Sequence, residues 1–290
     1  TEQPMLQIGD YTIYLINDGT TIVDPGGPFG LVPRALWSRV IPPDENMQVP
    51  MTTICLLVKA NGQNIVIDTG RGRKISEKEQ SYLNLQRPHG DLLDGLARLD
   101  LKPEDIDLVI DTHLHSDHCG GNTRLDNDGN IVPTFPNAEY VVQKREYEDA
   151  THTNERTSAT YFSSNWDVLF ETGQIRLLEG DTEIVPGIYG QIAPGHTPGH
   201  MAVRFESNGQ HAAFVCDMAS LAVHFEKLAW VTAYDVEPLI TIETKRKWQQ
   251  WALETNAILI FPHEPYRLAS RLTLDERGRP RLEPIDVDFV

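Results

Sequence analysis

The stretch that decides the fold is Asp111-Thr-His-Leu-His-Ser-Asp-His-Cys-Gly-Gly121. It directly follows the apolar run Leu108-Val-Ile110, which has the length of a short buried strand. Residues two apart in an extended chain point the same way, so the first two histidines can face one point in space. The following Asp-His pair comes after the chain has begun to turn, helped by the two glycines, and can face a neighbouring point. The stretch therefore predicts a metal site that includes His113, His115, Asp117 and His118.

Three more side chains that can bind metal lie just past the ends of predicted strands. They are His196 in the turn Pro194-Gly-His-Thr-Pro-Gly-His200, Asp217 after the apolar run 212–216, and His263 after the apolar run 257–261. We expect the loops at these strand ends to gather into one site with the first four residues. Imidazole and carboxylate together suit zinc and other first-row divalent ions. Seven ligands exceed what one tetrahedral ion needs, so the sequence predicts two ions that share a bridging carboxylate.

The remaining elements follow an α/β pattern, and no Ser/Gly linker divides the chain. Strands come in two batches, each followed by a helix, which predicts two similar halves packed into one body. Strands are expected at 11–17, 53–59, 64–68, 108–110, 140–143, 175–178, 188–192, 202–205, 212–216 and 257–261, and helices at 92–99, 144–149 and 240–254.

The composition excludes several classes of protein. The chain has 290 residues, with 25 Lys and Arg against 42 Asp and Glu, a net charge of −17. This charge repels nucleic acid and anionic membrane faces, so neither is an expected partner. The sequence contains no run of about 18 apolar residues, so no membrane span is predicted. The three cysteines form no CxxC pair and are expected to be reduced thiols. The first ten residues show no signal peptide, so a cytoplasmic protein is expected unless a leader has been trimmed.

Residues 19–51 are rich in Gly and Pro but also carry several apolar side chains. Loops of this length are uncommon unless they are functional or contain short elements of their own. The segment is therefore expected either to pack on the body or to cover a site as a lid. Within it, Leu31 to Trp37 is also a candidate surface for self-association into a homodimer.

In combination, the HxHxDH stretch, the GHTPGH turn, the strand-end Asp and the late His resemble the metallo-β-lactamase superfamily over the whole chain. The resemblance implies an αββα sandwich of two mixed sheets flanked by helices, formed by residues 1–290 as a single domain. It also implies a dinuclear centre at one sheet edge. Asp68 matches a family Asp that orients a ligand histidine, the alternative being a turn carboxylate. The implied ligands are His113, His115 and His196 for the first ion and Asp117, His118 and His263 for the second, with Asp217 bridging them.

Three segments narrow the resemblance to the YtnP-like quorum-quenching lactonases, whose layout is similar to that of the methyl parathion hydrolase group. They are Phe29–Trp37, Ala150–Thr157 and Ala233–Pro238. There is one departure in the expected substrate pocket. Better-known acyl-homoserine lactonases place a Tyr three residues after the bridging Asp, where this sequence has Ser220. If a phenol steadies the lactone carbonyl, His224 or a Tyr from elsewhere, such as Tyr161, must replace it.

The implied chemistry is direct hydrolysis, because two metal ions that share a water bring its pKa near neutrality. The bridging hydroxide would attack an acyl carbonyl, with Asp217 holding both ions and Asp117 steering the water or moving its proton. No Gly-x-Ser-x-Gly nucleophile segment is present. We expect two zinc ions, with manganese, cobalt and iron as alternatives.

The expected substrate is a small neutral lactone, first an N-acyl homoserine lactone, whose acyl chain Phe29 and Trp37 would shelter if they do not simply pack on the sandwich. An organophosphate triester or aryl ester is the alternative. Glyoxalase II-type thioester hydrolysis is disfavoured because no clear basic cluster near the C-terminus is present to bind the glutathione carboxylates, although Arg267, Arg271 and Arg277 keep it open. A metal-binding protein without catalysis is disfavoured because all seven ligands are present.

Overall fold

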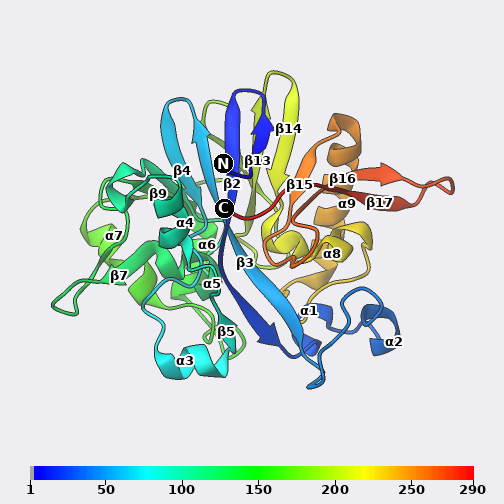
Figure 1. The fold of residues 1–290 in the computed structure, drawn as a ribbon, viewed down its shortest axis with the longest axis horizontal. Helices are drawn as coiled ribbons and strands as arrows, with labels where there is room; N and C mark the ends of the chain where they lie inside the picture. The colour runs from blue at the N-terminus through cyan, green and yellow to red at the C-terminus, as the bar shows by residue number, and fades with distance from the viewer. Residues whose placement is uncertain (1–2) are drawn as a thin grey trace.

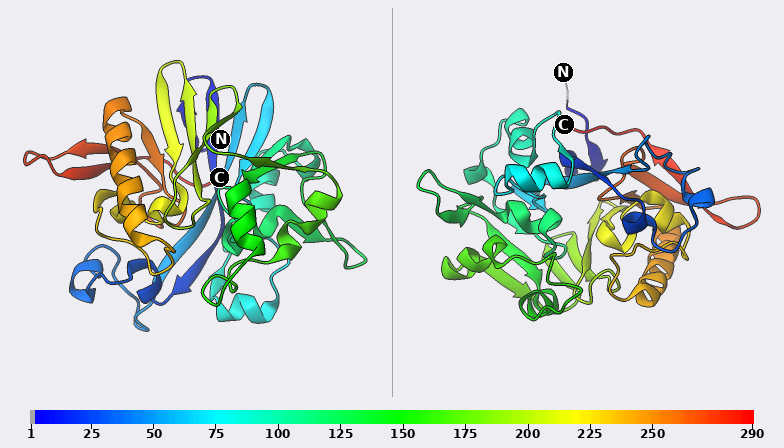
Figure 2. Two further views of the ribbon diagram at one scale, coloured as in Figure 1. Left: turned by 180° about the vertical axis from the view of Figure 1, so that it is seen from behind. Right: turned by 90° about the horizontal axis from the view of Figure 1, so that it is seen from below.

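The computed structural model describes residues 3–290. Two β-sheets pack face to face, and their facing side chains form one apolar core. Helices cover both outer faces: α4, α6 and α7 lie on one side of the strands in Figure 1, and α8 and α9 lie on the other. The views in Figure 2 show the same layering from behind and from below. The predicted αββα sandwich is confirmed.

The first sheet has the order β1-β2-β3-β4-β6-β9-β10, with β5 paired to β2. It is mixed, because β1 to β4 pair antiparallel and β4, β6, β9 and β10 pair parallel. Its strands are β1 (Leu6–Ile8), β2 (Tyr11–Val23), β3 (Val49–Ala60), β4 (Gln63–Ile67), β5 (Leu85–Gln86), β6 (Leu108–Ile110), β9 (Glu139–Gln143) and β10 (Ile175–Leu178).

The second sheet has the order β11-β12-β13-β14-β15-β16-β17, and its one parallel pair in the described residues is β14 with β15. A separate small hairpin joins β7 (Thr123–Leu125) to β8 (Ile131–Pro133). The strands of the second sheet are β11 (Thr182–Val185), β12 (Ile188–Ile192), β13 (Met201–Ser207), β14 (Gln210–Phe214), β15 (Ile258–Ile260), β16 (Ala269–Leu274) and β17 (Pro280–Ile285).

The helices lie between and outside these strands. The segment between β2 and β3 contains two short ones, and α9 follows the loop that ends at Glu237. The α-helices are α1 (Gly26–Phe29), α2 (Arg34–Trp37), α3 (Glu77–Tyr82), α4 (Leu92–Arg98), α5 (Ser116–Cys119), α6 (Lys144–Thr151), α7 (Asp167–Glu171), α8 (Ala222–Glu226) and α9 (Pro238–Thr255), and the 3₁₀ turns are η1 (Pro103–Asp105), η2 (Gly120–Asn122), η3 (Ser163–Asn165) and η4 (Cys216–Ala219).

The long apolar run of β3 reflects a strand that is covered on both faces. Ile54, Leu56 and Val58 point into the core between the sheets. The alternate residues Cys55 and Leu57 pack under α4 instead. Because both faces are buried, the strand lacks the polar alternation of a half-exposed strand. This explains why its sequence reads as a continuous apolar stretch.

The predicted loop at 19–51 is wrong at both ends. β2 continues to Val23 and β3 begins at Val49, and these two residues pair in register. The register of this hairpin shifts between Asn17 and Gly19, which breaks the alternation that a strand search relies on. Residues 24–48 alone connect the two strands.

The C-terminal hairpin of β16 and β17 was not predicted. Leu272 and Leu282 are register partners and bury their side chains beside α9. The neighbouring positions Arg271 and Glu283 also pair, and such polar positions dilute the apolar signal of a sheet with one solvated face. The three cysteines are free and buried. Within residues 3–290, no helix has both the length and the apolar character needed to cross a membrane.

Candidate metal centre and cavity

The seven predicted ligand side chains converge where loops from both sheets meet. The loop after β6 and the start of α5 carry four of them, on the first sheet. The turn after β12, the 3₁₀ turn η4 after β14 and the loop after β15 carry the other three, on the second sheet. The residues are His113, His115, Asp117 and His118 from the first sheet, and His196, Asp217 and His263 from the second.

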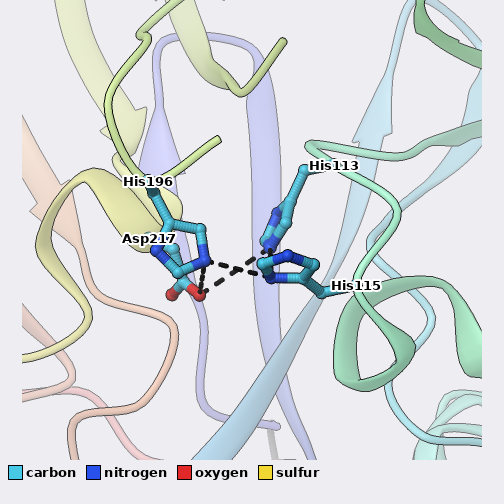
Figure 3. Close-up of side chains that lie close together, drawn as sticks. All are labelled: His113, His115, His196 and Asp217. Carbon is cyan, nitrogen blue, oxygen red and sulfur yellow. Dashed lines mark hydrogen bonds and ion pairs between the residues drawn. The ribbon is translucent and has the colours of Figure 1, made fainter. Parts of the chain in front are cut away.

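Four of these side chains form a first group, drawn in Figure 3. The ligand atoms of His113, His115, His196 and Asp217 all lie within 4.8 Å of one another. His115 Nδ1 lies 3.1 Å from both His113 Nε2 and His196 Nε2. His196 Nε2 also lies 3.1 Å from Asp217 Oδ2. One point in space can therefore be reached by three imidazole nitrogens and a carboxylate oxygen.

The second group contains Asp117, His118 and His263, whose ligand atoms also lie within 4.8 Å of one another. His118 Nε2 and His263 Nε2 are 3.3 Å apart, and each lies 3.8 Å from Asp117 Oδ2. Asp217 reaches this group as well, with Oδ2 at 3.4 Å from His118 Nε2 and Oδ1 at 3.1 Å from His263 Nε2. The Asp217 carboxylate therefore lies between the two groups.

Buried hydrogen bonds hold the far side of these imidazoles. His118 Nδ1 lies 2.8 Å from Asp68 Oδ2, and Asp68 in turn accepts hydrogen bonds from the backbone N–H and the hydroxyl of Thr112, each at 2.8 Å. His263 Nδ1 lies 2.6 Å from the carbonyl oxygen of Thr52. Such partners fix the orientation of an imidazole and leave its other nitrogen free to bind a metal.

His196 has a partner of the same kind that the sequence did not reveal. Its Nδ1 lies 3.0 Å from Asp235 Oδ1, and Asp235 also accepts a hydrogen bond from Thr232 Oγ1 at 2.9 Å. Asp235 falls in Ala233–Pro238, a segment noted above for its family resemblance. Nothing in its spacing pairs it with His196, which lies 39 residues earlier.

The charges of the cluster fit divalent cations. Burial and the neighbouring imidazoles lower the pKa of His115 to about 3 and put that of His113 well below its usual value, so both are neutral at pH 7. Burial raises the pKa of Asp217, but His263 and His196 outweigh it and hold it well below its usual range. Burial lowers the pKa of His196, yet the Asp217 and Asp235 carboxylates raise it to about 10. His196 therefore carries a proton at pH 7 in the absence of a cation, and a bound divalent ion would displace it. With that proton released, imidazoles beside ionised carboxylates are the donor set that zinc and similar ions prefer.

A cavity of about 420 Å³ opens on this cluster. Ligand side chains from both groups line it, among them His115, Asp117 and His263. Its walls come from the ends of β2 and β3, from Arg71, and from the loops 156–160 and 233–236. The side chain of Asp117 is 24% exposed, whereas that of Asp217 is 6% exposed, so the Asp117 carboxylate is the more accessible of the two.

The model of the family described as metallo-beta-lactamase superfamily matches residues 50–227. The chain belongs to this superfamily. The match begins within β3 and ends just after α8, so it contains all the predicted ligands except His263. His263 lies beyond the matched residues, and its place in the site rests on the geometry given above.

Curated relatives and solved structures agree with this assignment. An N-acyl homoserine lactonase of Bacillus sp. is 25% identical over 237 residues, covering 78% of this chain and 86% of the relative. The N-acyl homoserine lactonase AttM of Rhizobium radiobacter is 24% identical over 239 residues, covering 77% and 84%. A probable metal-dependent hydrolase from Staphylococcus aureus superposes with a TM-score of 0.86 at 31% identity, covering 97% of this chain and 99% of that one.

A structure with lower identity shares the fold. AidC, described as a dizinc quorum-quenching lactonase in complex with a product, has a TM-score of 0.78 at 20% identity and covers 97% of both chains. Together with the homology, the family match makes this member of the metallo-β-lactamase superfamily a metal-dependent hydrolase.

Arg71 is a cavity residue of this superfamily member that sequence reasoning missed. Its Nη2 lies 3.7 Å from Asp117 Oδ2, and its buried Nε has no hydrogen-bond partner among the described residues. Burial raises the pKa of Asp117, but His118 and Arg71 outweigh it and hold that pKa well below its usual range. Arg71 follows Asp68-Thr-Gly70, so its closeness to a motif residue was the available signal.

The structure corrects part of the predicted substrate pocket. Phe29 and Trp37 stack on each other at 5.2 Å and are buried with Leu221 and Val223. They do not line the described cavity, because the apolar side chains of residues 24–48 fill their own satellite core. In the same segment Leu31 is 99% exposed, so self-association there stays a prediction.

Of the three polar pocket candidates, Ser220 alone lines the described cavity, and its Oγ donates to Asp217 Oδ1 at 3.3 Å. His224 is buried, and its Nδ1 accepts a hydrogen bond from the backbone N–H of Leu221. The ring of Tyr161 packs 5.0 Å from that of His115, while its hydroxyl donates to Glu146. The tyrosine that does line the cavity is Tyr234, which the sequence did not single out.

Proposed function

We propose that this protein is a dinuclear metal-dependent hydrolase that opens lactone rings, with N-acyl homoserine lactones as its first substrate class. The observation that carries the proposal is the position of Asp217. Its two oxygens lie 3.1 Å from His196 Nε2 and from His263 Nε2, which belong to different ligand groups. A carboxylate between two clusters of hydrogen-bonded imidazoles is suited to bridge two ions.

We propose zinc as the resident ion, held by His113, His115 and His196 on one side and by Asp117, His118 and His263 on the other. Divalent ions bound there would supply an activated water at neutral pH and polarise the carbonyl of the substrate. Asp117 is placed to orient that water or to take up its proton, because its carboxylate lines the cavity and is ionised at pH 7.

The cavity wall supports a small ester or lactone with an apolar tail. Val23, Met51 and Val236 are apolar lining residues that suit an acyl chain, while Arg71 and Tyr234 offer hydrogen-bond donors. Burial, together with the Asp117 and Asp217 carboxylates, raises the pKa of Tyr234 to about 12, so its phenol keeps its proton at neutral pH. We propose that this phenol donates to the lactone carbonyl in the place of a Tyr at position 220. The relatives described as N-acyl homoserine lactonases support the same substrate class.

A substrate panel on metal-replete protein tests this proposal. N-hexanoyl homoserine lactone, a paraoxon-like triester and an aryl acetate would be compared by kcat/KM on one batch of known metal content. We expect the lactone to be preferred by at least about a hundredfold, a difference of about 2.7 kcal/mol between the transition states. Turnover of the triester or aryl ester with no lactone opening would overturn the substrate assignment and leave the metal centre in place.

A further inference from the structure

Glu146 is a buried carboxylate that no part of the proposed chemistry uses. It lies on α6, and its side chain accepts three hydrogen bonds. Oε1 accepts from the backbone N–H of Leu114 at 3.0 Å and from the hydroxyl of Tyr161 at 2.9 Å. Oε2 accepts from the hydroxyl of Thr197 at 2.5 Å. A carboxylate with three donors from separate segments restricts the position of each of them.

Two of these donors, Leu114 and Thr197, belong to the loops that carry the first group of ligands. Leu114 lies between His113 and His115, and Thr197 directly follows His196. The Tyr161 ring packs against the ring of His115. The two loops extend from different sheets, and the Glu146 carboxylate hydrogen-bonds to both.

The backbone around Glu146 is packed closely on the same turn. A Cβ atom added to Gly199 would lie 2.3 Å from the backbone nitrogen of Glu146, closer than real Cβ contacts come. The turn that carries His196 is therefore held against α6 by close packing as well as by the hydrogen bond from Thr197. Both contacts restrict how far this turn can move from α6, and the hydrogen bond from Leu114 ties the other loop to the same side chain.

We propose that Glu146 is a positioning residue that sets the separation of His115 and His196 and thereby the affinity of the first metal ion. This inference rests on the proposed metal centre. His115 Nδ1 and His196 Nε2 are 3.1 Å apart, and an ion between them needs that spacing kept within a few tenths of an ångström. Hydrogen-bonded partners outside the ligands typically change metal affinity by about 10- to 100-fold.

The test measures the two stepwise zinc dissociation constants by chelator competition, alongside thermal unfolding of the metal-free protein. We expect Glu146→Ala to weaken one ion by about 10- to 100-fold and to leave the other within about threefold. Glu146→Gln keeps an acceptor for Leu114 and should restore part of the affinity. Glu148→Gln is the matched control, because Glu148 is an exposed carboxylate on the same helix and should behave as the wild type.

A residue that only stabilises the fold would lower the unfolding temperature and leave both zinc constants unchanged, and that result would overturn the inference. If Glu146→Ala does not fold, Tyr161→Phe combined with Thr197→Val removes two of the three donors and keeps the side-chain shapes. Wild-type zinc constants in that double variant would also overturn it. Failure of the proposed metal centre is a separate outcome, because the wild type itself would then bind fewer than two ions.

Discussion

The floor and the wall of the cavity are built in different ways. The floor consists of the seven predicted ligand side chains defined above. They come from loops and short helical turns that follow strands, and three of their imidazoles are braced by buried hydrogen bonds to Asp68, Asp235 and Thr52. The wall consists of Arg71, Tyr234, the ends of β2 and β3, and the loops 156–160 and 233–236. Tyr234 is 46% exposed, whereas His113 in the floor is fully buried.

Because of this difference, we expect the floor to determine the chemistry of the site and the wall to determine which substrates it prefers. A floor fixed by packing and hydrogen bonds presents a constant set of ligands, as a metal centre requires. A wall built from loops can change without loss of the core. We therefore expect floor variants to abolish reaction with every substrate, and wall variants to change the ranking of substrates.

The largest effect is expected in the floor, at the residue between the two ligand groups. Asp217→Asn removes the charge of the carboxylate proposed to bridge the ions, so we expect a loss of one metal ion and a fall in kcat/KM of about a thousandfold for every substrate. Metal analysis and steady-state kinetics check this together. Asp128→Asn, an exposed carboxylate in a surface turn, is the matched control. Retained hydrolysis with both ions bound would show that Asp217 does not bridge the ions.

The next largest effect is expected at Arg71, a wall residue whose Nη2 lies 3.7 Å from Asp117 Oδ2 in the floor. Arg71→Met removes a charged donor and should lower kcat/KM by about 10- to 100-fold, since hydrogen bonds to charged groups contribute about 1.5–3 kcal/mol. Arg71 also helps to hold the pKa of Asp117 below its usual value. Without the guanidinium that pKa rises, so activity should begin to fall at a higher pH on the acid side.

A pH profile of kcat/KM measures this shift of the acid limb. Arg71→Lys keeps the positive charge and should keep the wild-type profile within experimental error. An unchanged acid limb in Arg71→Met would show that the guanidinium does not act on Asp117.

A smaller effect is expected at Tyr234. Tyr234→Phe removes one neutral donor, so we expect kcat/KM for the lactone to fall by about three- to tenfold, mainly through kcat, with metal content unchanged. Tyr82→Phe is the matched control, because Tyr82 is 88% exposed and lies on α3 outside the cavity lining. An equal loss for lactone and triester would argue against a specific contact with the lactone carbonyl.

The smallest effect on catalysis is expected behind the wall. Trp37→Ala should lower the free energy of unfolding by about 3 kcal/mol, since it empties a buried aromatic site. Because Trp37 does not line the described cavity, kcat/KM of the folded variant should stay near the wild-type value for short and long acyl chains. A fall in kcat/KM for long acyl chains alone would show that residues 24–48 contribute to binding the substrate.

The floor could be predicted from the sequence and most of the wall could not. Ligand residues follow strands at spacings that backbone geometry dictates, so His113 and His115 were recognisable at once. Asp235 contacts His196, which lies 39 residues earlier, and Glu146 contacts Leu114, which lies 32 residues earlier. A single carboxylate has no periodic signal that would reveal such a contact.

The same limit explains the wrong loop boundaries. The strand end at Thr21 and Val23 lines the cavity, so it lacks the apolar alternation that marks a strand buried in a core. Phe29 and Trp37 are recognisable as apolar, but nothing in their spacing indicates that they pack against Leu221 and Val223 and not against the cavity.

The most direct test of the central claim is the metal content of the purified wild-type protein after dialysis against metal-free buffer, measured per chain together with that of Asp217→Asn. We predict about two divalent ions per wild-type chain and about one in the variant. One ion or fewer in the wild type, or an unchanged pair of ions in the variant, would contradict a dinuclear floor bridged by Asp217.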